Sequence, residues 1–336
     1  MDAKKKIRFG IIGCSRIAKK AAMPALLDSE FAELAMVGSR SEDDARICAA
    51  QFGCDAYGTY DEVLKNKDVD AVYISLPNSL HEEWTVRAAE AGKHVWCEKP
   101  AALTYTSAQK MVAACKRSGV RLMEGFMFLS HPQHARVRNL IQEKVLGELL
   151  VFKGCFAFPM PDEGNIRLNA NLGGGSYNDA ATYPLRASRM IFNEEPVSIV
   201  CNLTLNPTTG VDVKADMLLM YPGGRSAFIS SAFDAYFQST YSILGSRALV
   251  TMERAYAVPK DRGVRIFLES GDKVKEIPIE PADHFVLMID EFCREILSGN
   301  SSTRNYEEEL LSHARVLHAG RISSEEGRVV HLGELT

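Results

Sequence analysis

The sequence predicts an α/β fold in two domains: a doubly wound parallel sheet, then an α+β domain with a large, mostly antiparallel open sheet. The chain has 336 residues, and domains of about 150 residues are typical, so two hydrophobic cores can form. Up to about residue 126, short apolar runs alternate with amphipathic stretches, which is the pattern of a parallel sheet covered by helices. Later segments form successive strand patterns joined by turns. We therefore expect domains at 1–126 and 127–336.

The first domain is predicted from its apolar runs and its helix caps. Strands are expected at Ile7–Ile12, Glu33–Gly38, Asp70–Leu76, His94–Cys97 and Val120–Phe126. Helices are expected from the Ser41 cap to Gly53, from Leu80 to Ala91, and from Thr104 to Gly119. Pro24 is expected either to break the first helix or to restart it as a first-turn proline.

The second domain is predicted to begin with a helix around His134–Glu143 and a strand at Glu148–Phe158. A stretch rich in Pro, Asn and Gly follows, then a helical segment that ends near Phe192. From Val197 to Ile279 the chain is typical of strands joined by turns. Helical patterns return at Phe285–Leu297 and Glu307–Arg321.

Charge and composition narrow the classes of function. The sequence has 39 basic and 43 acidic residues, a net charge of −4, and no run of five basic residues, so we expect no nucleic-acid partner. No stretch of 18 apolar residues occurs, so we expect no membrane span. The eight cysteines are scattered, without a C-x-x-C pair or clustered metal-ligand spacing, so we expect free thiols, no metal site and a cytoplasmic protein.

The first strand runs into a candidate phosphate-binding turn. Its residues are Gly13, Cys14, Ser15, Arg16, Ile17 and Ala18. At this position a doubly wound fold binds a dinucleotide pyrophosphate with backbone N–H groups and the helix dipole. Ser15 replaces the second glycine of the fingerprint and Ala18 the third. The alternative is a strand–helix turn that needs one glycine.

The residues at the end of the second strand indicate whether NAD(H) or NADP(H) is preferred. NAD sites usually offer an acidic side chain to the adenosine ribose here, but this chain has Ser39 and Arg40. Arginine can pair with a ribose 2′-phosphate. We therefore expect NADP(H) to be preferred over NAD(H). The alternative is a solvated loop arginine.

Two further stretches resemble a known family. They are Val72-Tyr-Ile-Ser-Leu-Pro-Asn78 with His81, and Ala91-Gly-Lys-His-Val-Trp-Cys-Glu98-Lys99-Pro100. They resemble the signature of the Gfo/Idh/MocA oxidoreductases, which have a Rossmann domain followed by an open-sheet substrate domain. Leu122-Met-Glu-Gly-Phe-Met-Phe, His131-Pro-Gln, and Asn165-Ile-Arg-Leu before Gly173-Gly-Gly are similar to one group of that family. That group holds glucose–fructose oxidoreductase, dihydrodiol dehydrogenases, aldose dehydrogenases and sugar 3-ketoreductases.

The resemblance implies roles for residues in the first domain. Lys99 follows a strand end, where ligands of open α/β sheets bind, and its ammonium can stabilise negative charge on the reacting oxygen. Glu98 would orient Lys99 or meet the nicotinamide ribose. The cofactor site would be lined by Leu76, Pro77, Asn78 and His81. For His81 the alternative is a structural histidine at a helix start.

In the second domain, Asp179 and Tyr183 are four residues apart, so they share a face if the segment is helical. Three preceding glycines, 173–175, would let the backbone approach a ligand closely, and Pro184 makes the helix irregular. By resemblance Tyr183 acts as acid or base, and an ammonium such as Lys99 nearby would favour its phenolate. Asp179 would position the tyrosine or the substrate, and Arg167 would reach cofactor or substrate.

We therefore expect an enzyme that exchanges hydride between NADP(H) and a sugar carbon that bears a hydroxyl or ketone. A ketoreductase on a keto-sugar, including a nucleotide-linked one, is favoured. The alternatives are an aldose 1-dehydrogenase for xylose or glucose, a dihydrodiol dehydrogenase, NAD-dependent glycoside cleavage, and a non-catalytic NADP-binding module. Either Lys99 or Tyr183 would supply the proton. By resemblance, the open sheet would form a homodimer or homotetramer.

Overall fold

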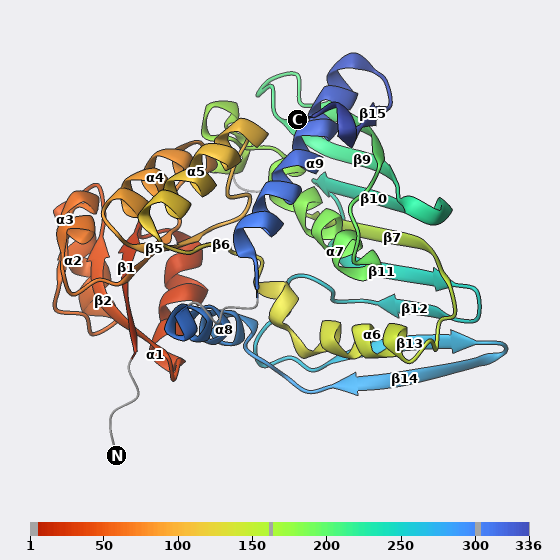
Figure 1. Ribbon diagram of the computed structural model, residues 1–336, viewed down its shortest axis with the longest axis horizontal. Coiled ribbons are helices and arrows are strands. Elements are labelled where there is room, and N and C mark those ends of the chain that lie inside the picture. The colour runs from red at the N-terminus through yellow and green to blue at the C-terminus, as the bar shows by residue number, and fades with distance from the viewer. Residues whose placement is uncertain (1–5, 161–163, 300–303, 336) are drawn as a thin grey trace. The chain divides into compact units, whose positions relative to one another are not determined.

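A computed structural model describes residues 6–160, 164–299 and 304–335 of the chain (Figure 1). These residues form two compact units. The first takes its residues from Met1–Met127 and His284–Leu311, and the second from Phe128–Asp283 and Ser312–Thr336. The expected domain boundary after residue 126 lies one residue before the chain first passes from one unit to the other, after Met127. Residues 284–311, which we expected in the second domain, belong to the first unit.

The first unit is built on a parallel sheet. In its described part the strand order is β3-β2-β1-β4-β5-β6. The strands are β1 (Ile7–Ile12), β2 (Ala32–Gly38), β3 (Tyr57–Gly58), β4 (Ala71–Ile74), β5 (His94–Cys97) and β6 (Leu122–Glu124). The order reverses between β1 and β4, and open α/β sheets bind their ligands at such a switch point, beyond the carboxyl ends of the strands.

Helices cover both faces of this sheet, as Figure 1 shows. They are the π-helical turn η1 (Ala18–Ala22), α1 (Met23–Asp28), α2 (Glu42–Gln51), α3 (Tyr60–Lys65), η2 (Asn78–Leu80), α4 (His81–Glu90) and α5 (Tyr105–Ser118). Three caps follow the sequence prediction. Ser41 accepts a hydrogen bond from the Asp44 N–H, Thr104 caps α5, and Gly119 ends α5 at φ 67°. Pro24 lies in the first turn of α1, directly after the π-helical turn η1, and the helix continues through it without a break.

Two contacts explain why residues 284–311 belong to the first unit. On α8 (His284–Ser298), Asp290 accepts a 2.5 Å hydrogen bond from the hydroxyl of Ser29, which follows α1. At the start of α9 (Tyr306–Glu326), Glu307 accepts hydrogen bonds from Arg121 Nε at 3.0 Å and from the Leu122 N–H at 2.9 Å. Helix α8 and the beginning of α9 therefore anchor to α1 and to the edge strand β6.

The second unit is built on a mostly antiparallel sheet, with the order β14-β13-β12-β11-β7-β10-β9-β8-β15 in its described part. Only the central pair, β7 and β10, is parallel among the pairings described. The strands are β7 (Leu149–Phe158), β8 (Ser198–Leu205), β9 (Asp212–Met220), β10 (Ser226–Phe233), β11 (Gln238–Gly245), β12 (Leu249–Met252), β13 (Val264–Ser270), β14 (Lys273–Ile279) and β15 (Val330–His331). The predicted fold class is confirmed.

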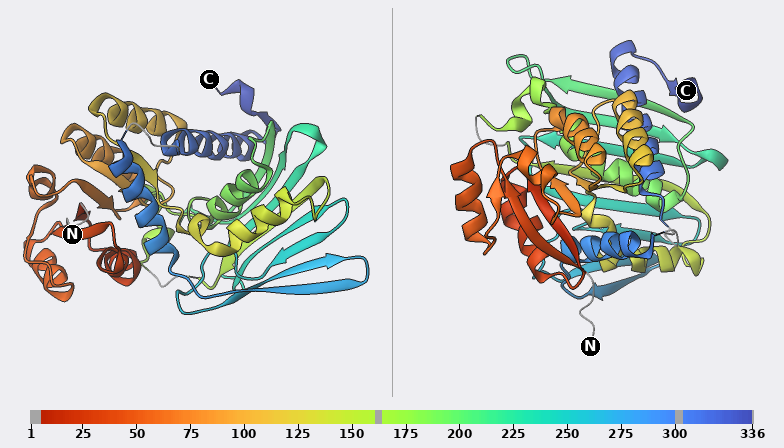
Figure 2. Two further views of the ribbon diagram at one scale, coloured as in Figure 1. Left: turned by 60° about the horizontal axis from the view of Figure 1, so that its bottom comes forward. Right: turned by 60° about the vertical axis from the view of Figure 1, so that its left-hand side comes forward.

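Helices lie on one face of this second sheet (Figure 2). They are α6 (Pro132–Gln142), the helical run formed by η6 (Tyr177–Ala181) and α7 (Thr182–Phe192), and the later part of α9. The run from Tyr177 to Phe192 begins with a π-helical turn, and Pro184 lies just after that turn. The expected irregularity at Pro184 is therefore present.

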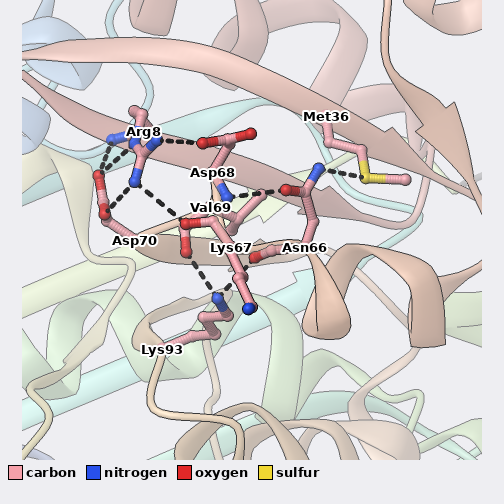
Figure 3. A network of polar contacts seen from close by, with 8 residues as sticks. All are labelled: Arg8, Met36, Asn66, Lys67, Asp68, Val69, Asp70 and Lys93. Atoms are coloured by element: carbon pink, nitrogen blue, oxygen red, sulfur yellow. Dashed lines mark hydrogen bonds and ion pairs between the residues drawn. The ribbon is translucent and has the colours of Figure 1, made fainter.

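A network of ion pairs and hydrogen bonds lies at the amino ends of the parallel strands (Figure 3). Arg8 on β1 makes a two-point contact with Asp70, with both N···O distances 3.0 Å, and it also pairs with Asp68 at 2.7 Å. Lys93, just before β5, donates to the carbonyl oxygens of Asn66 and Val69, each at 2.7 Å. The network ties the loop before β4 to its two neighbouring strands.

Through the described ranges, no helix has the length and apolar character needed to cross a membrane. Within the same ranges, no group of three or more His, Cys, Asp or Glu side chains is arranged to hold a metal ion.

Candidate active site

The predicted phosphate turn is a tight, glycine-dependent turn between β1 and the first helix. Gly13 has φ +102°, and an added Cβ would come within 2.8 Å of a Leu76 methyl carbon. Its N–H donates to the Gly38 carbonyl at 3.1 Å, and its carbonyl accepts from the Ser75 hydroxyl at 2.7 Å. The ends of β2 and β4 therefore fix the backbone of this turn.

The helix that follows the turn begins at Arg16 and runs without a break to Asp28. The Ser15 hydroxyl accepts from the Ala18 N–H at 3.1 Å, so it takes the place of an N-cap. Arg16 is exposed and Ile17 is half-buried. Burial, together with the neighbouring Cys48 thiol, raises the pKa of Cys14 to about 12, so its thiol brings no negative charge to the turn.

Ser39 and Arg40 directly follow β2, as predicted. Ser39 is buried and Arg40 is exposed. The Tyr60 phenol lies close enough to Arg40 for the positive charge to oppose the rise in its pKa that burial causes. Tyr60 also packs edge-on against Trp84, with ring centroids 4.9 Å apart. An exposed guanidinium with the Tyr60 phenol nearby thus stands at the end of β2.

The Glu98-Lys99-Pro100 segment is held by its neighbours. The Tyr73 hydroxyl on β4 donates to Glu98 Oε1 at 2.8 Å. Glu124, at the end of β6, accepts from the Ala101 N–H at 2.8 Å. Lys99 is half-buried in the loop after β5. This loop is therefore fixed from both adjacent strands, at the carboxyl edge of the sheet.

His81 does not present a ring nitrogen to solvent, although the sequence placed it in the lining of the cofactor site. The side chain is fully buried, with Nδ1 3.0 Å from the Pro100 carbonyl oxygen and Nε2 2.9 Å from that of Leu76. Burial lowers its pKa. His81 thus bridges the end of β4 and the Lys99 loop, as the structural alternative expected. Leu76 is buried, whereas Pro77 and Asn78 are half-buried at the start of η2.

The second unit brings three predicted residues together. Arg167 Nε donates to Asp179 Oδ2 at 2.6 Å, and the side chains are 42% and 16% exposed. The charge of Asp179, and to a lesser degree the nearby Tyr183, raises the pKa of Arg167. One guanidinium therefore faces both the carboxylate and the phenol, which are carried by the helical run from Tyr177 to Phe192.

The three glycines allow a close approach of the chain to itself. The Gly175 N–H donates to the Arg167 carbonyl at 2.8 Å, and a Cβ on Gly174 would overlap that same carbonyl. Gly173 and Gly175 have φ values of 77° and 108°. These glycines are explained without a bound ligand, because they allow the backbone to fold over Arg167 and so position its side chain.

Aromatic rings surround Tyr183, which is 6% exposed. Ring centroids of Phe156, Phe128 and Tyr256 lie 5.1, 5.8 and 5.9 Å from its own. Packing of this kind fixes the phenol direction, and the pairs are each worth about 1 kcal/mol. These partners could not be predicted from local sequence patterns, because they come from β7 and from segments far apart along the chain.

The glycine turn at the switch point of a parallel sheet, with an open-sheet domain after it, defines a class of two-domain nucleotide-dependent enzymes. Residues 7–126 match the model of an oxidoreductase family with an NAD-binding Rossmann fold, and residues 134–251 match the GFO/IDH/MocA C-terminal domain. The chain therefore belongs to the GFO/IDH/MocA oxidoreductases, and the predicted resemblance is confirmed.

Its relatives fall in the group that the sequence indicated. A dTDP-3,4-didehydro-2,6-dideoxy-alpha-D-glucose 3-reductase of Actinomadura kijaniata is 33% identical over 94% of this chain and 95% of its own length. A D-xylose 1-dehydrogenase (NADP(+)) of Haloferax volcanii is 32% identical over 96% of this chain and 99% of its own. A crystal structure of a 3-ketoreductase from Actinomadura kijaniata with NADP and TDP-benzene matches at a TM-score of 0.91 and 33% identity, covering 95% and 98% of the two chains.

Proposed function

We propose that this protein is an NADP(H)-dependent sugar oxidoreductase and that its substrate is a keto-sugar, including one linked to a nucleotide. The observation that carries the proposal is the group formed by Arg167, Asp179 and Tyr183, where a phenol and a carboxylate face one guanidinium. Such a group can orient a hydroxyl or ketone and exchange a proton with it.

The residues of the first unit fit a dinucleotide phosphate. The turn at Gly13 leaves no room for a side chain, because a Cβ would meet Leu76 and Ser75, and the helix from Arg16 directs its N-terminus to this turn. Arg40 is exposed at the end of β2, where it would meet the ribose 2′-phosphate, and neither it nor Ser39 adds a negative charge. Gly13, Cys14, Ser15, Arg16 and Ile17 would hold the pyrophosphate, and Leu76, Pro77, Asn78 and Glu98 would border the nicotinamide half.

The nicotinamide, when bound, supplies the hydride that adds to the carbonyl carbon of the substrate. As the C=O π bond breaks, the oxygen gains charge and takes a proton from Tyr183 or Lys99. The 2.6 Å ion pair between Asp179 and Arg167 would hold the phenol in a fixed orientation relative to the substrate. In the opposite direction the same groups accept the proton of a sugar hydroxyl.

The names of two relatives support the substrate class and the cofactor, because one is a keto-sugar 3-reductase and the other an NADP(+)-dependent dehydrogenase. Solved structures of the matched 3-ketoreductase also include single-residue variants at a lysine and at a tyrosine. The spacing of those two positions along the chain equals the spacing of Lys99 and Tyr183. This agreement supports the assignment of both residues to the reaction.

Substrate tests separate the proposal from its alternatives. Loss of NADPH absorbance with a dTDP-linked 3-keto-deoxysugar would support the ketoreductase. Gain of NADPH absorbance with NADP⁺ and D-xylose or D-glucose, without turnover of the keto-sugar, would instead support the aldose 1-dehydrogenase, which the halophilic relative favours. A folded protein that binds NADPH but turns over neither would overturn the enzyme assignment.

The role of Tyr183 has a matched control in Tyr236, which is 88% exposed. We expect Tyr183→Phe to lower kcat by about 10²-fold, because the phenolic proton is lost while the ring packing stays. Tyr236→Phe should leave kcat unchanged. Equal kcat values for both variants and the wild type would remove Tyr183 from the mechanism.

We also propose that the helix-free face of the second sheet forms a homodimer or homotetramer. One row across neighbouring strands on this face includes Val200, Leu218 and Phe228, and Val200 and Phe228 are 41% and 47% exposed. Apolar side chains in such a row are typical of an interface. Light scattering of the wild type and of Phe228→Lys tests this, since the variant should dissociate.

A further inference from the structure

A carboxylate from the second sheet holds the start of the helical run that carries Asp179 and Tyr183. Asp212, the first residue of β9, accepts a hydrogen bond from the Tyr177 N–H at 2.5 Å. It is 9% exposed, so the contact lies away from bulk water. An acidic group at a helix N-terminus satisfies donors that the helix itself leaves unpaired, and its charge complements the helix dipole.

The surrounding chain is shaped to admit this carboxylate. Gly175 has φ +108°, and an added Cβ would overlap Asp212 Oδ1. The next residue, Ser176, is fixed from β10 by a 2.8 Å contact between its hydroxyl and that of Ser231. Arg321 on α9 donates to the side-chain oxygen of Asn178. Strands β9 and β10 and helix α9 therefore hold the first turn of the run together.

We propose that Asp212 is a positioning residue for the reaction: its carboxylate anchors the first turn at Tyr177 and so sets the placement of Asp179 and Tyr183. The catalytic consequence of this inference rests on the proposed function, whereas the anchoring of the first turn does not. Asp179 lies two residues beyond the anchored N–H, and its own N–H donates to Gly175 at 3.0 Å. A shift of the first turn therefore moves the carboxylate that holds Arg167.

The anchor should respond to pH. Burial raises the pKa of Asp212 to about 6, against the opposing hydrogen bonds from the backbone N–H groups of Tyr177, Asp212 itself and Ser176. The ionisable groups that face it are Arg321 from α9, the Tyr177 phenol of the anchored turn, and the Cys201 thiol from β8. Burial raises the pKa of both the phenol and the thiol, so neither changes charge between pH 5 and 8. The change of charge in this range falls on Asp212.

Amide hydrogen exchange of the full-length protein without ligands measures the anchoring directly. With intrinsic rates corrected, the peptide over 175–183 should exchange about tenfold faster in Asp212→Asn than in the wild type at pH 8, because a charge-assisted hydrogen bond is about twice as strong as a neutral one. The peptide over α5 should not change. Asp272→Asn, in an exposed turn, should behave as the wild type.

Kinetics provides the second readout. With NADPH and the keto-sugar, Asp212→Asn should lower kcat about tenfold and lose the dependence on a group of pKa near 6. Its affinity for NADPH should stay within twofold of the wild type, because the cofactor residues belong to the first unit. Protection in Asp212→Asn equal to that of the wild type at pH 8 would overturn the inference. So would unprotected exchange of the Tyr177 N–H in the wild type at pH 8, a result that requires no variant to fold. If no sugar is turned over, the proposed function fails while the exchange result still decides the anchoring.

Discussion

In the first unit, the parallel strands carry different kinds of contact where they begin, at the amino edge of the sheet, and where they end, at its carboxyl edge. At the amino edge, Arg8 and Lys93 close onto Asp70 and onto backbone carbonyls of the loop before β4 (Figure 3). At the carboxyl edge, Tyr73 and Ser75 hold the main chain and the neighbouring acid, while Arg40 and Lys99 extend from loops.

The difference shows how one sheet separates stability from chemistry. At the amino edge, the charged side chains bind acceptors of the chain itself, and so they fix the loop before β4. At the carboxyl edge, neutral donors and buried groups such as His81 fix the loops that carry the cationic side chains. Substitutions at the two edges should therefore change different measured quantities.

The largest effect is expected from Lys99→Ala at the carboxyl edge. We expect kcat to fall by about 10³-fold, because a group that stabilises charge on the reacting oxygen is removed. The free energy of unfolding should change by less than about 1 kcal/mol. Lys110→Ala is the matched control, since that lysine is exposed on α5 and pairs with Glu82. Equal kcat for the two variants would contradict the division between edges.

The next effect is on stability, from Lys93→Met at the amino edge. Two carbonyl oxygens lose their donor, and one of these contacts is buried, so we expect unfolding to cost about 2 kcal/mol less. Steady-state kcat should not change. Urea unfolding measures the first quantity, with Lys65→Met as an exposed control. A loss of kcat without a loss of stability would reverse the roles of the edges.

A smaller effect concerns pH at the amino edge. Burial, then the charge of Arg121, lowers the pKa of His94, whose Nδ1 accepts from the Arg121 N–H at 3.0 Å. The unfolded chain therefore binds the proton first, and the stability from His94 falls as pH falls below about 6.5. In His94→Asn an amide oxygen can replace Nδ1 without titrating. We expect unfolding free energies at pH 7, 6 and 5 to fall less steeply, by at most about 1.4 kcal/mol per pH unit. An unchanged slope would contradict this account.

The sequence predicted what depends on neighbouring residues. The Ser41 and Thr104 caps, Gly119, the first-turn position of Pro24 and the strand of Ile7–Ile12 are encoded within a few positions of each feature. The short elements β3 and α3 were not predicted. Helix α3 has six residues and is fixed mainly by the capping box of Thr59 and Glu62, which a search for longer apolar patterns overlooks.

Long-range partners were beyond a single sequence. The assignment of α8 to the first unit depends on Asp290 meeting Ser29, and the anchor of the helical run from Tyr177 to Phe192 depends on Asp212 meeting Tyr177. Both pairs join segments whose separation carries no local signal. Arg167 and Asp179 were each predicted, but their pairing needed the fold of the glycines between them.

The most direct test of the central assignment is a paired titration of the protein with NADPH and NADH, followed by energy transfer from Trp84 and Trp96, both in the first unit. We predict at least tenfold tighter binding of NADPH, and Arg40→Ala should remove most of that difference while NADH binding stays the same. Equal affinities that Arg40→Ala does not alter would contradict the assignment of the 2′-phosphate site. Binding of neither cofactor by the folded protein would contradict the oxidoreductase itself.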